Sequence, residues 1–180
     1  AAKQIVVKSG SDPRLHLFEV IVRDHGIEQA GNNKANIEGI WGSAAAPLCY
    51  VQDLSNQNAY RLAVDVQFTS DPQQADQTVT VLSGTGRASQ TVWYANDSAV
   101  VNAHEFGHML ALYDQYMGGA LANPASPTES FTGLMGWGVW TQPTSPYMYL
   151  SYYQRDLDFM YQIDPGGSYR VVRLPPPPPP

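Results

Sequence analysis

The most informative stretch of the sequence runs from residue 96 to residue 114 and reads NDSAVVNAHEFGHMLALYD. It opens with Asn96, Asp97 and Ser98, three residue types that favour the N-cap position of a helix. Residues 99–112, which follow, contain no proline and a single glycine. We therefore predict a helix over residues 99–112, and this helix carries the candidate functional residues.

Residues 104–108 of this predicted helix form an H-E-x-x-H motif. Because residues four apart lie on one face of a helix, the imidazoles of His104 and His108 point the same way. Two such nitrogens can bind zinc, and Glu105 beside them can accept a proton from an activated water. The motif predicts a catalytic zinc site, and its less specific interpretation is a helix with two hydrogen-bonded histidines.

A catalytic zinc needs a third protein ligand and an open fourth position. Asp114 follows His108 by six residues, whereas the other histidines, His16 and His25, lie far upstream. Glu129 is the competing third ligand, 21 residues after His108, in a segment rich in Pro, Ser and Thr that forms helices poorly. Asp114 and Glu129 are thus both candidates for the third ligand.

The run from His104 to Asp114 resembles the metzincin clan of zinc peptidases. The clan pattern is H-E-x-x-H-x-x-G-x-x-H, and Asp replaces the last His in some members, such as the snapalysins. Ala111 departs from this pattern because it stands where the clan has glycine. The resemblance implies zinc on His104, His108 and Asp114, with Glu105 as the catalytic residue.

A second mark of the metzincins is the Met-turn, a tight turn whose methionine lies beneath the metal. Residues 133–138, which read GLMGWG, resemble it and put Met135 in that place. In gluzincins, by contrast, a glutamate from a second helix completes the zinc site, which is the role that Glu129 would have.

The rest of the chain alternates between short apolar strands and turns. We predict strands over residues 5–7, 15–22, 48–54, 60–68, 79–82, 91–94 and 169–174, with further helices over 33–46 and 147–163. Between residues 113 and 146, many glycines and prolines predict an irregular segment. These elements indicate the α+β class, and residues 175–180, all proline, read as a polyproline linker or tail that joins a longer chain.

The resemblance gives this α+β chain a more detailed architecture. It implies one catalytic domain over residues 1–174 with two lobes. The upper lobe, about residues 1–112, would hold a twisted mixed sheet and helices, including the zinc-binding helix. The lower lobe, about residues 113–174, would be small and irregular, with the Met-turn and a C-terminal helix.

Composition narrows the function classes. The 180 residues are 43% hydrophobic and carry a net charge of −6, which argues against a nucleic-acid binder. No apolar run approaches the roughly 20 residues that span a bilayer. Cys49 is the only cysteine, so no internal disulfide forms. Several metzincins bind calcium, but no 12-residue calcium loop supports that ion here, because the loop pattern is absent around the candidate aspartates, which are Asp71, Asp76, Asp156, Asp158 and Asp164.

We therefore expect a zinc endopeptidase that acts on protein or peptide substrates and is secreted or exported, with the cytosol as the alternative location. Glu105 would serve as general base and then as general acid, and a tyrosine hydroxyl would help to stabilise the oxyanion. The candidates for that hydroxyl are Tyr113, Tyr116, Tyr147, Tyr149, Tyr152 and Tyr153. Family analogy also predicts that the strand from Thr91 to Tyr94 borders the cleft. The alternatives are an inactive zincin-like binding module, a gluzincin-type hydrolase using Glu129, and a hydrolase of small amides.

Overall fold

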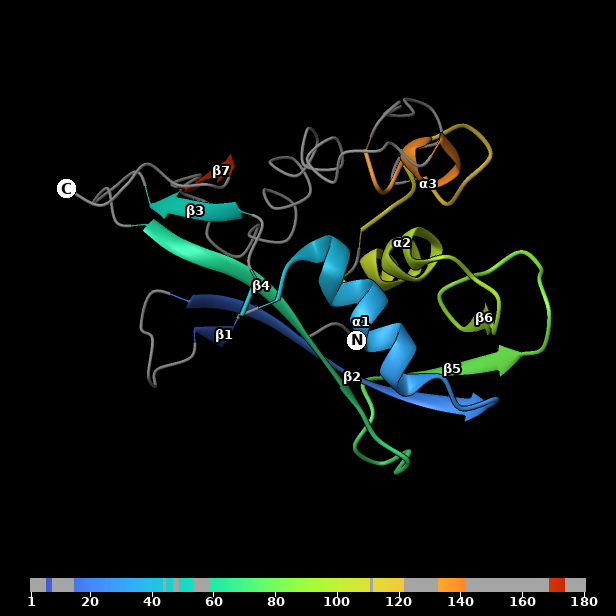
Figure 1. Cartoon of the computed structure of the whole chain (residues 1–180). Coiled ribbons are helices and arrows are strands. Elements are labelled where there is room, and N and C mark those ends of the chain that lie inside the picture. The colour runs from blue at the N-terminus through green and yellow to red at the C-terminus, as the bar shows by residue number, and fades with distance from the viewer. Residues whose placement is uncertain are drawn as a thin grey trace.

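The structure is a computed structural model of the chain, and it describes residues 6–7, 15–43, 45–46, 49–53, 59–110, 112–121, 133–141 and 169–173. It is a mixed fold in which helices cover a sheet that contains parallel strands (Figure 1). This agrees with the coarse α+β class expected from the sequence. The strands are β1 (Val6–Val7), β2 (Leu15–Gly26), β3 (Cys49–Asp53), β4 (Ala59–Phe68), β5 (Gln77–Leu82), β6 (Val92–Tyr94) and β7 (Tyr169–Arg173). The helices are α1 (Ala30–Trp41), α2 (Ala99–Met109) and α3 (Gly138–Thr141).

The described strands form one sheet in the order β6-β5-β2-β4-β3-β7, and β1 pairs with the beginning of β2. β2 runs parallel to β4 and to β5, and β5 runs parallel to β6. β3 is antiparallel to both β4 and β7. Each strand predicted from the sequence therefore has a counterpart, and the chain reaches β4 from β2 through α1, as a parallel pair requires a crossover.

The core lies between the sheet and the helices. Along β4, Val64 and Val66 are buried while Asp65 and Gln67 are not, which confirms the alternation predicted for this strand. α1 and α2 contact each other and lie on one side of the sheet, and α3 contacts α2 (Figure 1). The largest buried side chains are Trp41, Trp93, Phe106, Ile37, Met109 and Met135.

The prediction of a helix over residues 33–46 was wrong at both ends. The helix begins at Ala30, and the backbone N–H of Asn33 already donates to the carbonyl of Gln29 (2.9 Å). It ends at Trp41 because Gly42 adopts a φ of 95°, a left-handed value that glycine accepts without strain. The Gly42 carbonyl then accepts from Val64 (2.9 Å), which joins the end of α1 to β4.

Some predicted features lie outside the described residues. These are the closing helix over 147–163, Glu129, Ala111 and the prolines of 175–180. Among the residues that the structure does describe, none belongs to a helix with the length and hydropathy needed to cross a bilayer.

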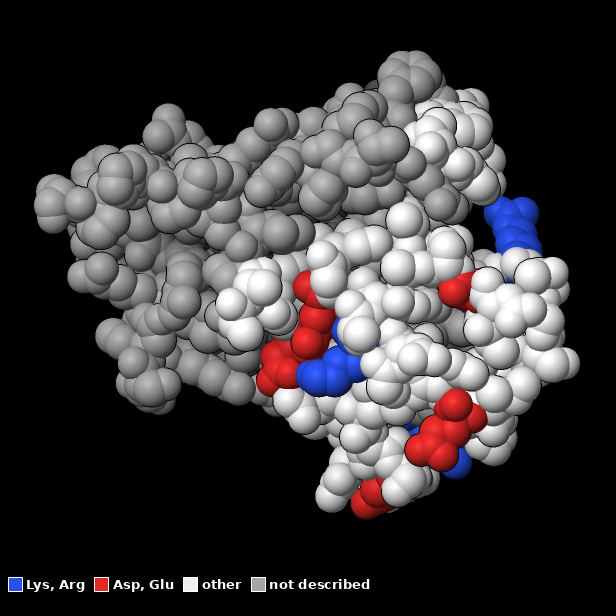
Figure 2. Space-filling model, in the orientation of Figure 1, with Lys and Arg blue, Asp and Glu red and all other residues white. Residues whose placement is uncertain are grey.

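Charged side chains are sparse on the described part of the face shown in Figure 2, and acidic and basic groups meet beside α1. There, Lys34 Nζ lies 2.7 Å from Glu38 Oε1 and 3.4 Å from Asp65 Oδ1. Lys34 also donates to the carbonyl of Val66 (2.7 Å), so this group holds α1 against β4.

Candidate metal centre

The apolar side of α2 fixes how the helix is rotated. Ser98 caps the helix, and its Oγ accepts from the backbone N–H of Val101 (3.3 Å). Trp41 Nε1 donates to the carbonyl of Ala103 (2.8 Å), and its ring meets Phe106 edge-on at 6.3 Å. With Ala103 and Phe106 held against the core, the intervening motif residues are turned toward a cavity.

α2 ends at Met109, three residues earlier than the sequence predicts. The backbone N–H of Leu112 donates to the carbonyl of Gly107 (3.1 Å), which turns the chain back over the last helical turn. This reversal brings the Leu112 carbonyl to the ring of His108. The early helix end is therefore part of how the centre is assembled.

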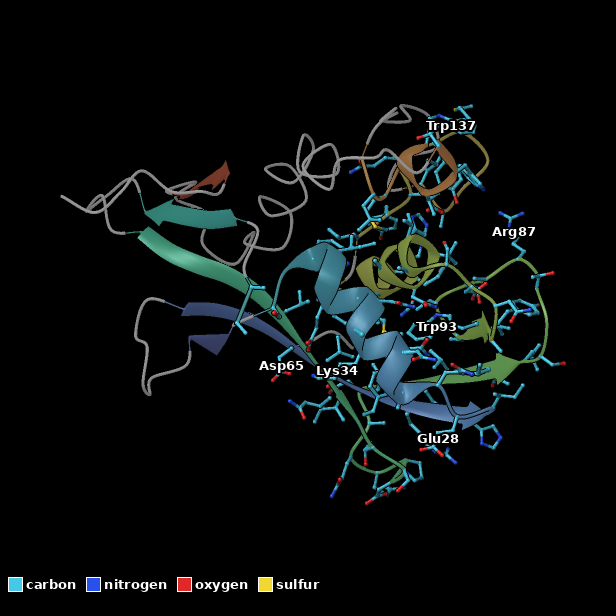
Figure 3. All side chains as sticks on the ribbon, viewed as in Figure 1. Glu28, Lys34, Asp65, Arg87, Trp93 and Trp137 are labelled. Atoms are coloured by element: carbon cyan, nitrogen blue, oxygen red, sulfur yellow. The ribbon has the colours of Figure 1, made fainter. Side chains whose placement is uncertain are left out.

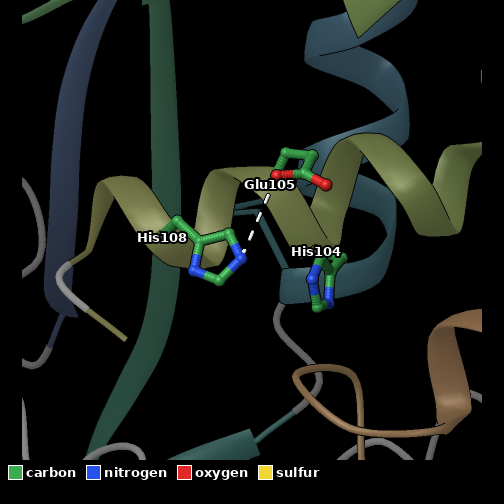
Figure 4. Close-up of side chains that lie close together, drawn as sticks. All are labelled: His104, Glu105 and His108. Carbon is green, nitrogen blue, oxygen red and sulfur yellow. Dashed lines mark ion pairs between the residues drawn. The ribbon is translucent and has the colours of Figure 1, made fainter. Parts of the chain in front are cut away.

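Both histidines use the same ring nitrogen on a backbone carbonyl. His104 Nδ1 lies 2.7 Å from the Leu134 oxygen, and His108 Nδ1 lies 2.9 Å from the Leu112 oxygen. A carbonyl only accepts, so in each pair the proton belongs to Nδ1. The neutral rings then expose a bare Nε2, the arrangement found in histidines that bind a metal. Figure 4 shows the two rings on the same side of α2, with their centroids 4.9 Å apart.

Asp114 faces these two Nε2 atoms. Its Oδ1 lies 3.0 Å from His104 Nε2 and 3.3 Å from His108 Nε2. Its Oδ2 accepts from the backbone N–H of Ala120 (2.7 Å), and its own N–H donates to the Ala120 carbonyl (2.9 Å). A Cβ on Gly119 would lie 2.5 Å from the Cβ of Asp114, so this tight loop needs glycine there.

While both rings are neutral, two nitrogens without hydrogens thus face one carboxylate oxygen. Asp114 Oδ1 is buried and has no hydrogen-bond partner within the described part of the chain. Leaving such an atom unpaired is costly, and a cation removes the cost. Ligands of one tetrahedral zinc at about 2.0–2.1 Å lie about 3.3–3.4 Å apart, close to the two distances found here. The residues present therefore fit a small metal ion.

Glu105 belongs to the same cluster but stands farther from the nitrogens. The ligand atoms of His104, Glu105 and His108 all lie within 4.8 Å of one another, so this group can hold a metal ion. Glu105 Oε2 is 4.0 Å from His108 Nε2, the contact drawn in Figure 4. Asp114 Oδ1, at 3.3 Å, is closer to His108 Nε2 than Glu105 Oε2 is.

The charges of the cluster shift its proton affinities when no cation is bound. Burial raises the pKa of Glu105, although the neighbouring histidines oppose that shift. Burial also disfavours the charged Asp114, but hydrogen bonds from His104 and His108 outweigh it and hold its pKa well below the usual range. For His108, the Asp114 carboxylate overcomes the effect of burial, so its pKa is raised. These bonds form when a ring also takes up a proton on Nε2, and that proton then lies between the ring and Asp114, where a cation would sit.

Met135 lies directly beneath α2. Its side chain is fully buried, and a Cβ on Gly107 would come within 2.3 Å of its sulfur. The backbone N–H of Gly136 donates to the carbonyl of Gly133 (3.0 Å), which closes a tight turn around Leu134 and Met135. This turn places the Leu134 carbonyl within hydrogen-bond distance of His104 Nδ1.

A cavity of about 290 Å³ opens over the cluster. One wall is the segment Arg87–Gln90 and another is Gly118–Ala120. The other lining residues are His104, Glu105, His108, Asp114 and Tyr116. The wall therefore comes from the residues that precede β6, and Tyr94 is absent from the lining, contrary to the expectation for the cleft border. Tyr94 instead packs against Gly86.

Tyr116 is the candidate tyrosine that lines this cavity. Its ring stacks over His104 with a centroid distance of 6.2 Å, and burial together with the charge of Asp114 raises its pKa. Tyr113 is 46% exposed and does not line the cavity. Tyr147, Tyr149, Tyr152 and Tyr153 lie outside the described residues.

Sequence reasoning missed the backbone partners of the centre. The Leu112 and Leu134 carbonyls and the Ala120 N–H orient the side chains that the motif identified. The motif also gives no sign that Arg87 lines the cavity. The pair Gly118-Gly119 was a usable signal, because two glycines soon after a candidate ligand predict a tight turn.

Comparison with protein-family models, with curated proteins and with solved structures finds no match to this chain in any of the three.

Proposed function

We propose that the chain is a zinc-dependent endopeptidase with His104, His108 and Asp114 as metal ligands. One observation carries the proposal: two imidazoles use Nδ1 on backbone carbonyls and turn Nε2 toward a buried carboxylate oxygen, which has no donor while both rings are neutral. A structural zinc would be enclosed by four protein ligands. Here three ligands border an open cavity, which favours a catalytic role.

A zinc ion bound there would supply Lewis acidity, which polarises a carbonyl and makes water a stronger acid. The protein supplies the proton transfers. Glu105 accepts a proton from the attacking water and returns it to the leaving amine as the C–N bond breaks. Its burial keeps the carboxylate poorly solvated and thus more basic than an exposed one.

Tyr116 is our candidate for the oxyanion donor. Its pKa is raised by burial and by Asp114, so the hydroxyl is protonated at neutral pH and can donate a hydrogen bond. Stacking on His104 and contacts with Trp137 and Trp140, at centroid distances of 5.7 and 4.4 Å, hold its ring in place. A rigid donor stabilises developing charge better than a mobile one.

The metzincin assignment is part of the same proposal. It is supported by the order of sheet, helix and turn, by the Asp114 position and by the burial of Met135 under the helix. The gluzincin alternative uses Glu129, which lies outside the described residues. The binding-module alternative predicts a cluster that takes up metal without hydrolysing any peptide.

The variant Glu105→Gln tests the assignment most directly. We expect it to bind zinc stoichiometrically and to lose at least about 100-fold in kcat/KM, because proton transfer is removed while the ligands remain. Glu28→Gln is the matched control, since Glu28 is exposed and does not line the cavity. Zinc content is measured by elemental analysis, and cleavage is measured on a mixed peptide library with mass spectrometry.

Three results would count against the proposal. Cleavage by Glu105→Gln at the wild-type rate would remove Glu105 from the mechanism. Bound zinc with no cleavage of any peptide by the wild-type chain would favour the binding module. Cleavage of small amides alone would identify a different hydrolase.

A further inference from the structure

We propose that Arg87 selects substrates by binding a carboxylate close to the scissile bond. This inference rests on the proposed peptidase function and adds a substrate class to it. The carboxylate is either the side chain of an acidic residue or the C-terminus of the peptide, and the second source would make the enzyme a carboxypeptidase instead of an endopeptidase. Both present the same planar anion to a guanidinium group.

Arg87 is placed to meet a substrate. It lines the same cavity as His104, His108 and Asp114, and no other lysine or arginine belongs to that lining. The side chain is exposed, and no carboxylate of the described residues forms an ion pair with it. Figure 3 shows it reaching away from the loop between β5 and β6, toward the side on which Trp137 lies.

The segment that carries Arg87 is held by local hydrogen bonds. Ser89 N–H donates to the Val92 carbonyl (2.8 Å), and Ser89 Oγ accepts from the N–H groups of Thr91 (3.3 Å) and Val92 (3.1 Å). Tyr94 covers Gly86 on the other side of Arg87. A braced loop lowers the entropy that is lost when its side chain binds a ligand.

The charge of the cavity favours an anion once a metal is present. A divalent cation balances the carboxylates of Glu105 and Asp114, so Arg87 leaves the loaded cavity with one net positive charge. The chain as a whole carries −6, but charges farther away than about 8–10 Å are largely screened. The remaining wall residues are small or neutral, including Ala88, Ser89 and Gly119, so none competes for the guanidinium.

The experiment uses the full zinc-loaded chain and matched peptides. One pair differs by an internal Glu or Gln beside the cleaved bond, with both C-termini amidated. A second pair has neutral side chains and differs by a free or amidated C-terminus. The variants are Arg87→Gln and, as a charge-matched control, Arg23→Gln, because Arg23 lies on β2 and does not line the cavity.

For the wild-type chain we expect kcat/KM to favour one acidic member of a pair by roughly tenfold, as a charge-assisted hydrogen bond would give. Arg87→Gln should bring that ratio close to one, while Arg23→Gln keeps it. Whichever pair shows the effect names the source of the carboxylate. Binding of the same peptides to Glu105→Gln, followed by fluorescence anisotropy, should show the same preference and weaken with added salt.

The outcomes separate the two proposals. Metal-dependent cleavage with equal ratios in wild type and Arg87→Gln would overturn the role of Arg87 and leave the peptidase standing. Acid-selective binding without cleavage would overturn the peptidase and leave the carboxylate site standing. Binding and cleavage of neither pair would overturn both.

Discussion

The two sides of α2 differ in what stabilises them: one side buries apolar groups and the other buries polar groups. On the side toward the sheet, Ala103, Phe106 and Met109 are buried among apolar side chains. On the side toward the cavity, His104 and Glu105 are equally inaccessible, yet they are polar and lie beside a buried carboxylate. Burial of the apolar side stabilises the folded chain, whereas burial of the polar side destabilises it unless each polar group has a partner.

This difference explains why the two sides draw on different parts of the chain. The apolar side needs only volume and shape, which the valines of the sheet and Trp41 supply. The polar side needs acceptors and donors at fixed points, and these come from the backbone at Leu112, Ala120 and Leu134. The comparison predicts that changes on one side affect stability and that changes on the other affect metal binding.

Phe106→Ala should have the largest effect on stability. Removing a fully buried phenylalanine leaves a cavity and costs about 3–5 kcal/mol. Because the loss comes from packing, we expect a similar decrease with zinc and with chelator present. Urea unfolding measures it, and Leu82→Ala, at a 43% exposed position, should cost far less. A decrease of under about 1 kcal/mol would mean that the apolar side does not support the fold as described.

Asp114→Asn should separate metal binding from stability. The change keeps the shape of the side chain but removes its charge, so we expect zinc affinity to fall by more than the roughly 10–100-fold typical of outer-shell partners. Competition with a fluorescent chelator measures the affinity. In chelator, the variant should lose much less stability than Phe106→Ala. If zinc affinity stayed unchanged here and fell in Glu129→Gln, the third ligand would be Glu129.

Most of the fold was predictable because it follows from local periodicity. Val64 and Val66 alternate with polar residues, and Ser98 marks the start of α2, so both elements could be placed from neighbouring residues alone. The predicted helix ran past the end of α1 because the sequence does not show that Gly42 adopts a left-handed φ. A left-handed glycine ends a helix without any proline.

The sequence predicts the side chains of the centre but not the backbone groups that orient them. The spacing of His104 and His108 is a property of any helix, so the motif located both. The carbonyls of Leu112 and Leu134 carry no sequence signature, since every residue has one, and only the folded chain shows which are used. Arg87 could not be predicted from the motif either, because it lies in the loop between β5 and β6 and only the folded chain brings that loop to the cavity.

Gly107→Ala tests the close packing of α2 against Met135. Alanine favours a helix by about 0.8–1 kcal/mol over glycine, but here its methyl group would press on the Met135 sulfur and cost about 1–3 kcal/mol. We expect a net loss of roughly 1 kcal/mol, measured by urea unfolding. Gly39→Ala is the matched control in α1, where nothing lies within 4 Å, so it should stabilise the chain. Equal stabilisation by both variants would show that Met135 yields without cost.

The smallest effect we predict is the pH dependence of stability, which should reverse its sign with metal. Without metal, the raised pKa of His108 stabilises the folded chain below its unfolded value of 6.5, and this contribution is lost as the pH rises through the folded pKa. The lowered pKa of Asp114 stabilises the chain above its unfolded value of 3.8 and is lost as the pH falls. The melting temperature in chelator should therefore be highest between about pH 4 and pH 6.5.

With zinc, stability should instead rise between about pH 6 and pH 8, because protons no longer compete for the imidazoles. Each kcal/mol corresponds to about 2–4 °C in a chain of this size, so thermal scans across pH resolve the difference. In Asp114→Asn the metal-free maximum should flatten, since the imidazolium loses the carboxylate that raises its pKa. A metal-free curve that keeps rising above pH 6.5 would show that His108 does not share a proton with Asp114. The polar side of α2 would then be held by its backbone carbonyls alone.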